Sequence, residues 1–387
     1  MILQYAVGGA IIPFITVLLR DRGLTVAQIS LILSANSAAL IFSPFLWGMI
    51  GDRFIPLNRL FAVMNLLAAA ALGLFAIHPG FWGSLISFTL FYACFQPAPT
   101  LVNALCFRHL DNPVEDFAPL RAWGSLGWIL PSLPIFCYFA IYPVKNFEFI
   151  IYLTLGLSVL MAATAFILPH TPPGAASHRP DRHHVTYFQA MKRLVHNPGY
   201  LAVLASYFLI SASFCIQAFY SPPRLSDLGL GRAWIGPVQC IGVVVEIICF
   251  YYRKPFLRWT GYAGSVLAGS LVLVARQVLF STSNNLWLLC GSYVLVGMTV
   301  VFYHIGVSIV VDALADEEVK ATAQSLLLLC SSGLGPLFAN WAVNRIIRWS
   351  GPDLKVVFWF ATALAAAAAI TLWLGRGKMT PHSRTSA

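Results

Sequence analysis

Charged residues are scarce in this sequence. Only 10% of its 387 residues are charged, with 14 acidic side chains in all, whereas 59% are hydrophobic. Soluble domains carry about 25% charged residues, so this composition excludes an ordinary soluble protein and predicts a membrane protein. The formal net charge of +10 then indicates lysine and arginine held on the cytoplasmic side of a membrane, and not a nucleic-acid partner.

Paired cysteines and catalytic motifs are also lacking. The 8 cysteines stand singly in or beside apolar runs, without CxxC or cysteine–histidine spacing, so neither a disulfide framework nor a metal site is predicted. There is no HExxH or GxSxG motif, and no pair of carboxylates interrupts an apolar run. We therefore expect no enzyme activity, no cofactor and no metal.

Long apolar runs dominate what is present. A membrane-spanning helix needs about 20 apolar residues, and runs of that length predict an all-α membrane protein with about twelve transmembrane helices. The expected spans are 2–19, 27–50, 57–77, 81–107, 120–141, 147–168, 200–220, 234–252, 259–280, 286–311, 322–347 and 356–374.

The longest polar stretch, residues 169–198, divides these spans into two sets of six. We expect an N-terminal bundle over 1–168 and a C-terminal bundle with a short cytoplasmic tail over 199–387. The stretch between them starts as a Pro/Gly/Ser-rich linker and ends with alternating apolar and basic residues, which predicts an amphipathic helix on the membrane surface. Lysine and arginine favour the loops on the side of both termini, so we expect both termini to be cytoplasmic in a cytoplasmic (inner) membrane.

One polar stripe stands out in the fifth run. Arg121, Ser125 and Trp128 follow one another at i, i+4 and i+7, so a helix presents them on one face. Arginine at membrane depth is costly and normally has a function. A charge, a hydroxyl and a large ring suit a polar ligand with a flat apolar surface, and Gly124 and Gly127 allow a helix or a substrate to approach closely. The alternative is that Arg121 only extends to the cytoplasmic interface.

A second motif, Gly48-Met-Ile-Gly51-Asp52-Arg53, falls between the second and third expected spans. It resembles the Gly-x-x-x-Asp-Arg/Lys loop of the major facilitator superfamily. Six plus six spans around a linker also match that fold, in which the substrate lies between two bundles. The resemblance implies that Gly48, Asp52 and Arg53 form a cytoplasmic latch between the bundles; the alternative is a solvated turn.

Several stretches resemble the nucleoside:H⁺ symporter family within this superfamily, over nearly the full length. They are 117–128 around Arg121, Leu168-Pro-His170, Arg276 in the ninth span and Ala321-Thr-Ala-Gln-Ser325. The stretch around Arg121 is shared more loosely with the lactose permease-like oligosaccharide:H⁺ symporters. In those proteins the matching arginine binds sugar hydroxyls and the matching tryptophan stacks on the sugar ring. The resemblance therefore implies a nucleoside or a sugar as the ligand.

Further polar residues interrupt the apolar runs of the second half. Glu246 stands alone in the eighth span, where an unpaired charge is strongly disfavoured and protonation is favoured. It resembles the membrane glutamate of the nucleoside symporters. Arg276 in the ninth span needs a counter-ion, for which Glu246 is the nearest candidate, and His304 in the tenth is the possible third member of this proton-coupling group. The alternatives are a structural ion pair and a core histidine.

Two glutamines complete the expected site. Gln217 aligns loosely with a nucleoside-contacting position of the family, and Gln239 precedes Glu246 by two helical turns. Both are candidate substrate ligands; the alternative is hydrogen bonding between helices.

We therefore expect a monomeric secondary transporter whose partners are a small polar solute, protons and the lipid bilayer. A nucleoside carried by proton-coupled alternating access is the first hypothesis. A sugar symporter, an efflux carrier, a facilitator without proton coupling and a non-transporting receptor on the same fold remain as alternatives.

Overall fold

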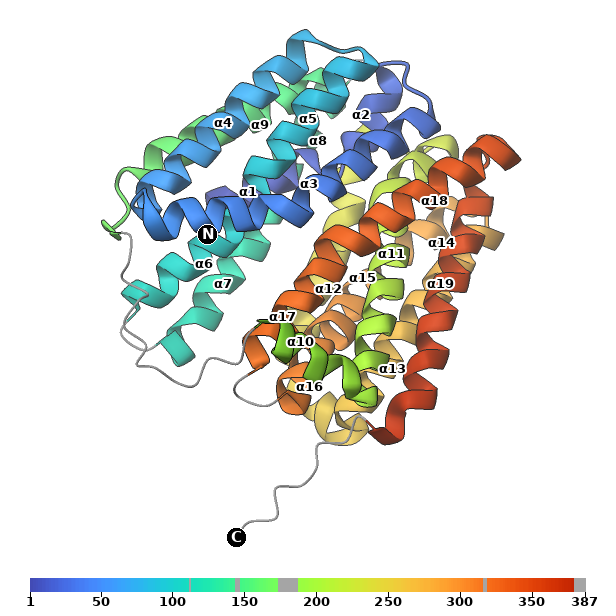
Figure 1. Cartoon of the computed structure of the whole chain (residues 1–387). Helices are drawn as coiled ribbons and strands as arrows, with labels where there is room; N and C mark the ends of the chain where they lie inside the picture. The colour runs from blue at the N-terminus through green and yellow to red at the C-terminus, as the bar shows by residue number, and fades with distance from the viewer. Residues whose placement is uncertain (111–112, 143–146, 173–186, 316–318, 379–387) are drawn as a thin grey trace. The chain divides into compact units, whose positions relative to one another are not determined.

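The computed structural model describes residues 1–110, 113–142, 147–172, 187–315 and 319–378. Every regular element in these residues is a helix (Figure 1). Among them, 12 helices are long and apolar enough to cross a membrane. The predicted all-α membrane fold is confirmed.

The membrane-length helices follow the predicted spans closely, and the third has the predicted bounds. They are Ile2–Asp21, Val26–Arg53, Leu57–Ile77, Phe81–His109, Trp123–Ile141, Glu148–Ala165, Pro198–Asp227, Arg232–Tyr251, Pro255–Thr282, Leu286–Asp312, Thr322–Ser350 and Leu354–Gly375. Several extend past the apolar run by a turn, because a helix keeps its hydrogen bonds where side chains turn polar.

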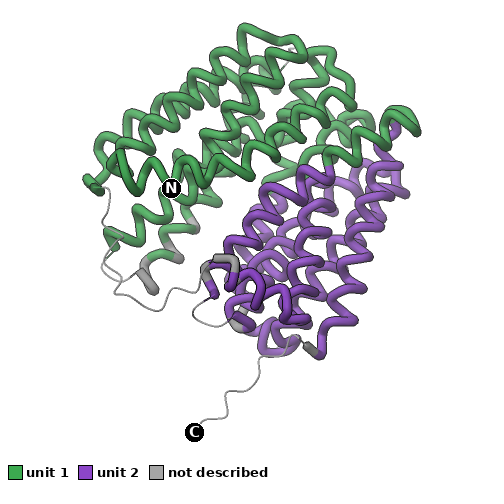
Figure 2. Tube along the Cα trace, viewed as in Figure 1, with its two compact units in different colours: residues 1–180, 218–240, 340–352 green, residues 181–217, 241–339, 353–387 purple. Residues whose placement is uncertain are grey.

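Two compact units are distinguished in Figure 2. Unit 1 comprises 1–180, 218–240 and 340–352, and unit 2 comprises 181–217, 241–339 and 353–387. Unit 1 thus takes two segments from the second half of the sequence. The proposed bundle boundaries at 168 and 199 stay a prediction.

Unit 1 has a core of buried apolar side chains, both small and large. Leu60, Phe61 and Met64 pack with Val102 and Met161. Its own helices are α1 (Ile2–Ile11), α2 (Ile15–Asp21), α3 (Val26–Arg53), α4 (Leu57–Ile77), α5 (Phe81–Phe95), α6 (Ala98–His109), α7 (Pro113–Ile129), α8 (Ser132–Ile141) and α9 (Glu148–Ala165). Parts of three further helices complete it, together with η1 (Arg232–Trp234): the end of α11 (Pro198–Asp227), the start of α12 (Ile235–Tyr251) and the end of α18 (Gly335–Ser350).

Unit 2 is built around buried residues of α11, α13, α16, α17 and α19. Its elements are α10 (Tyr187–His196), α11 (Pro198–Asp227), α12 (Ile235–Tyr251), α13 (Arg253–Thr282), α14 (Leu286–Gly291), α15 (Tyr293–Thr299), η2 (Val300–Ile305), α16 (Gly306–Leu314), α17 (Lys320–Leu328), η3 (Leu329–Leu334), α18 (Gly335–Ser350), α19 (Leu354–Gly375) and η4 (Arg376–Lys378). The helices α11, α12 and α18 contribute residues to both units.

Breaks in the helices fall where the backbone chemistry demands them. The chain turns at Pro131 between α7 and α8, since proline cannot donate to the preceding turn. Gly261 in α13 has a φ of +67°, which a residue with a side chain rarely adopts, and it marks a kink between the first turns of α13 and the rest of that helix. The segments η2 and η3 are π-helical, a form that frequently marks functional sites.

Candidate functional site

Close contact between α1 and α7 sets the position of the predicted stripe. A methyl group at Gly9 would overlap the backbone carbonyl of Trp128, and one at Gly127 would overlap the carbonyl of Ile2. At Gly124 it would lie 2.9 Å from the ring of Tyr5. The glycines therefore admit a neighbouring helix, one of the two roles predicted for Gly124 and Gly127.

Arg121, Ser125 and Trp128 lie on α7 and are all half-buried. The guanidinium carbon of Arg121 lies 4.4 Å from the ring centroid of Tyr5, a cation–π contact that holds the side chain along the helix. The indole ring of Trp128 packs at Gly8 of α1. The stripe is thus braced by α1 without being fully covered, as a ligand-binding face needs to be.

Glu246 is half-buried on the part of α12 that belongs to unit 2. Gly297 of α15 lies against this helix, because a methyl group there would fall 2.5 Å from the backbone nitrogen of Glu246. Gly242, one turn earlier, meets Val296 and the carbonyl of Tyr293 in the same way. Paired glycines therefore bring the glutamate-bearing helix onto the tenth span.

Arg276 has no exposed surface at all. Its guanidinium carbon lies 4.5 Å from the ring centroid of Phe280 and 4.5 Å from that of Tyr293. Within the described part of the chain its three side-chain nitrogens have no hydrogen-bond partner. Two aromatic faces therefore accompany this charge, and its pairing with Glu246 stays a prediction.

His304 lies in the π-helical segment η2, facing α11. Its Nδ1 is 3.3 Å from the hydroxyl oxygen of Tyr207, and its ring meets those of Phe214 and Tyr303 edge-on. Its Nε2 is buried and has no hydrogen-bond partner among the described residues. The histidine thus belongs to an aromatic cluster with one ring nitrogen unused, which is compatible with proton handling.

The two glutamines fall in different units. Gln217 is buried at the point of α11 where unit 2 ends. Gln239 belongs to unit 1, where its Nε2 donates to the carbonyl of Pro13 over 3.0 Å, at the break between α1 and α2. In this structure Gln239 therefore joins helices, while its role as a ligand stays a prediction.

The motif Gly48–Arg53 forms the end of α3, and not the loop that the sequence indicated. Asp52 and Arg53 are exposed, and within the described residues they make no hydrogen bond or ion pair. A methyl group at Gly48 would meet open space. The positive charge of Arg53 interacts favourably with the negative end of the helix dipole, so α3 continues past its apolar run as far as this residue.

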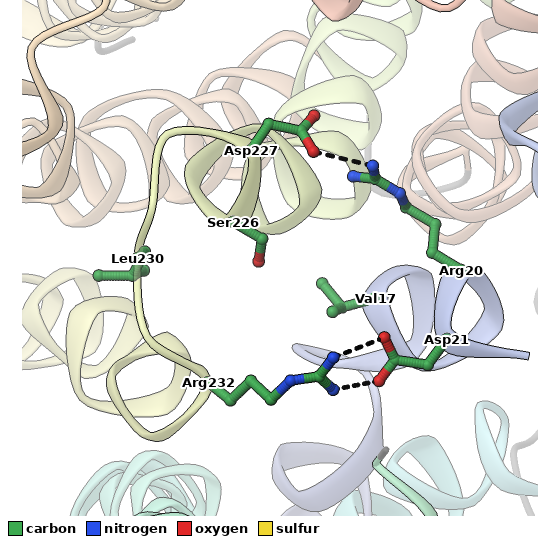
Figure 3. Close-up of a pocket in the computed structure, with 7 residues that line it drawn as sticks. All are labelled: Val17, Arg20, Asp21, Ser226, Asp227, Leu230 and Arg232. Atoms are coloured by element: carbon green, nitrogen blue, oxygen red, sulfur yellow. Dashed lines mark hydrogen bonds and ion pairs between the residues drawn. The ribbon is translucent and has the colours of Figure 1, made fainter. Parts of the chain in front are cut away.

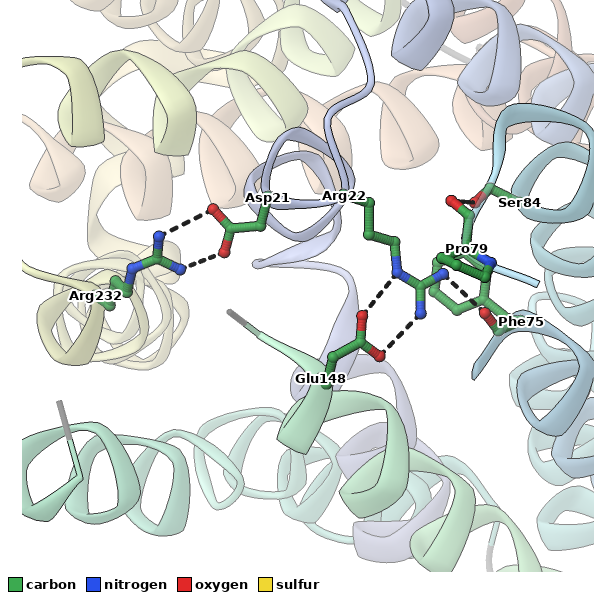
Figure 4. Close-up of polar contacts among 7 residues, drawn as sticks. All are labelled: Asp21, Arg22, Phe75, Pro79, Ser84, Glu148 and Arg232. Carbon is green, nitrogen blue, oxygen red and sulfur yellow. Dashed lines mark hydrogen bonds and ion pairs between the residues drawn. The ribbon is translucent and has the colours of Figure 1, made fainter. Parts of the chain in front are cut away.

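Sequence reasoning missed a group of ion pairs at the ends of unit 1 spans that lie away from Met1. We call it the far-side cluster: Arg20, Asp21, Arg22, Glu148, Asp227 and Arg232. Figure 4 shows Arg22 bonded to Glu148 and Asp21 bonded to Arg232. Its only sequence signal is the triplet Arg20-Asp21-Arg22 at the end of the first span.

The pairs of the far-side cluster differ in what they connect. Arg22 is 4% exposed, bonds both oxygens of Glu148 at 2.9 Å, and donates to the carbonyl of Phe75, all within the first half of the sequence. Arg20 bonds Asp227 at 2.8 Å, and Arg232 bonds Asp21 through two nitrogens. The last two pairs connect the first span to the seventh and eighth.

A cavity of about 330 Å³ lies between these two pairs, lined also by Val17, Ser226 and Leu230. Figure 3 shows Ser226 placed between the Arg20–Asp227 and Asp21–Arg232 pairs. Both arginines are 35% exposed. Water therefore reaches these pairs and weakens them, whereas the Arg22 side of its pair is shielded.

The described residues form 12 helices long and apolar enough to cross a membrane, and Glu246 and Arg276 lie inside two of them, as in a multi-pass membrane protein. Residues 1–355 match the MFS_1-like family, and the chain belongs to that family.

Three similar proteins show which members of the transporter class this chain resembles. YegT of Escherichia coli (strain K12), whose name assigns it provisionally to nucleoside transport, is 26% identical over 353 residues, covering 87% of this chain and 80% of that protein. The maltose permease of Geobacillus stearothermophilus is 24% identical over 347 residues, covering 88% and 84%. The solved structure of the nucleoside transporter NupG superposes with a TM-score of 0.83 at 18% identity, covering 97% of this chain and 96% of that one. These relatives are transporters, not enzymes.

Proposed function

We propose that this protein moves a nucleoside across the cytoplasmic membrane by proton-coupled alternating access, as a monomer with both termini in the cytoplasm. The observation that carries the substrate is the half-buried stripe on α7. Trp128 offers a ring face for a base, and Arg121 and Ser125 offer donors for ribose hydroxyls or base carbonyls. The nucleoside transporters named above support this choice.

Proton coupling is proposed to depend on Glu246. This half-buried carboxylate on a membrane helix takes up a proton before or with the substrate and releases it when the site opens to the cytoplasm. His304, whose Nε2 has no hydrogen-bond partner within the part of the chain that the structure describes, is the proposed assistant. Arg276 lies between the rings of Phe280 and Tyr293, and its positive charge is proposed to balance the charge of the coupling group. Gln217 and Gln239 are the remaining proposed ligands.

Two groups are proposed to alternate as gates. The far-side cluster holds one end closed through the Arg20–Asp227 and Asp21–Arg232 pairs. Asp52 and Arg53, exposed at the end of α3 beside Gly48, form the latch that closes the cytoplasmic end. Each closed end excludes the release of substrate to that side.

Uptake of labelled uridine or adenosine into proteoliposomes, with and without a protonophore, tests the proposal. We expect accumulation above equilibrium that the protonophore abolishes. A facilitator would equilibrate the nucleoside and ignore the protonophore. No uptake in either condition would leave the nucleoside assignment wrong.

A sugar is the second candidate, because the maltose permease is similar over 88% of this chain. Sugars share the hydroxyls and the stackable face that the α7 stripe recognises. Competition decides between them: excess unlabelled uridine should block labelled uridine uptake, and excess maltose should not. Blocking by maltose alone would move the assignment to sugars.

A further inference from the structure

One exposed face of α10 is not used by the transport mechanism. The helix packs onto unit 2 through Leu194, which is 3% exposed and shares a buried cluster with Tyr200 and Ala323. The opposite side carries Lys192 and Val195, both exposed. Together with Gln189, Met191 and His196 they line a groove of about 440 Å³.

The start of α11 determines where α10 lies with respect to the membrane. Asn197 Oδ1 accepts hydrogen bonds from the backbone nitrogens of Gly199 and Tyr200, at 3.0 and 3.2 Å, and so caps the start of this membrane-length helix. Because α10 ends one residue before that cap, it lies at the boundary between the apolar layer and water.

Aromatic residues mark the same level on other elements of unit 2. Spans alternate in direction, so the end of α12, the start of α13 and the end of α19 lie on the side of unit 2 where α11 begins. Tyr251, Trp259 and Trp373 are exposed there. Tyrosine and tryptophan prefer the headgroup level of a bilayer, so this side meets lipid headgroups.

The groove on α10 combines the two chemistries of a lipid. Val195 is 45% exposed and Met191 partly so, which suits an acyl chain. Lys192 is exposed beside them, and its side chain makes no hydrogen bond or ion pair within the described residues. A free ammonium group next to an apolar strip at the membrane surface is complementary to a negatively charged headgroup.

We propose that α10 binds an anionic phospholipid, with Lys192 on the phosphate and with Met191 and Val195 on the acyl chain. Zwitterionic lipid would meet the same apolar strip without the net charge attraction. A soluble anion would meet the charge without the strip. Both features together select an anionic phospholipid.

The test measures lipid association with the whole protein in vesicles of phosphatidylcholine, with or without phosphatidylglycerol, using spin-labelled forms of each lipid. The wild type should prefer phosphatidylglycerol. Lys192→Gln should lower this preference about fivefold, the effect of one basic residue at an anionic surface. Val195→Ser should weaken both lipids alike. Arg258→Gln removes another exposed charge on the same side and serves as the control, with the preference retained.

Three results would overturn the proposal. The first is an unchanged preference in Lys192→Gln. The second is an equal loss in Arg258→Gln, which would make the attraction a diffuse surface effect. The third is full displacement of phosphatidylglycerol by inorganic phosphate, which would make the groove a soluble-anion site. Because the readout is lipid association, none of these outcomes depends on which solute is transported.

Discussion

Asp21 forms a bidentate ion pair with Arg232. Replacing Asp21 by asparagine removes the negative charge of this pair and keeps the shape of the side chain. The pair connects the end of α2 to η1, with which the eighth span begins. If the far-side cluster is a gate, the substitution destabilises the closed form of that end and leaves each span intact.

The structure sets the size of the effect. Asp21 is 14% exposed and Arg232 is 35% exposed, so water screens the pair partly. Exposed pairs contribute about 0.2–1 kcal/mol, and two-bonded geometry favours the upper end of this range. About 1 kcal/mol corresponds to about a fivefold shift of the equilibrium toward the open end.

Cys240 is a natural reporter of this opening. Its sulfur donates to the hydroxyl of Ser132 over 3.3 Å where α12 meets α8, and the residue is half-buried. With the other cysteines replaced by serine, Asp21→Asn should raise the rate of Cys240 labelling by a membrane-impermeant maleimide about fivefold.

Glu148→Gln is the matched control, because it breaks the Arg22 pair inside the first half of the sequence. It should lower thermal stability without changing the labelling rate. The exchanged pair Asp21→Arg with Arg232→Asp should restore slow labelling. A labelling rate that rises in Glu148→Gln and not in Asp21→Asn would refute the gate.

Three other predictions follow from the proposed site and from helix packing. Trp128→Ala should weaken nucleoside binding about tenfold in an equilibrium binding assay, since stacking on a base contributes about 1–3 kcal/mol, and unchanged affinity would contradict a stacking role. Glu246→Gln should abolish proton-driven accumulation while keeping exchange of labelled for unlabelled nucleoside; accumulation that persists would remove Glu246 from coupling. Gly9→Ala should lower the unfolding free energy by about 1–3 kcal/mol, because a methyl group meets the rigid backbone of Trp128, whereas Gly156→Ala, which meets open space, should not.

The spans were predictable because an apolar run of about 20 residues has one stable form in a bilayer. The span Leu57–Ile77 shows this, with the same bounds in sequence and structure. Ends were less predictable: α3 continues through Arg53, past the last apolar residue. Hydrogen bonding along the backbone decides where a helix ends, and side-chain hydropathy reports on it only indirectly.

The individual polar residues were visible in the sequence because each interrupts an apolar run. Their partners were not, since partners come from distant spans. Arg276 stands out in the ninth span, whereas the ring of Tyr293 that lies beside it comes from the next span and was not foreseen. The far-side cluster was missed because its members lie in four separate segments with ordinary loop composition, and only packing brings them into contact.

By itself, the sequence determined the class of protein, the number of spans and the polar positions inside them, since the bilayer penalises every unpaired charge and every unbonded backbone group in the same way. Only the tertiary structure decided that α1 lies directly against the Arg121 stripe, that Tyr207 meets His304, and that Asp21 bonds Arg232. These contacts depend on shape and distance across helices, which no local pattern of residues specifies.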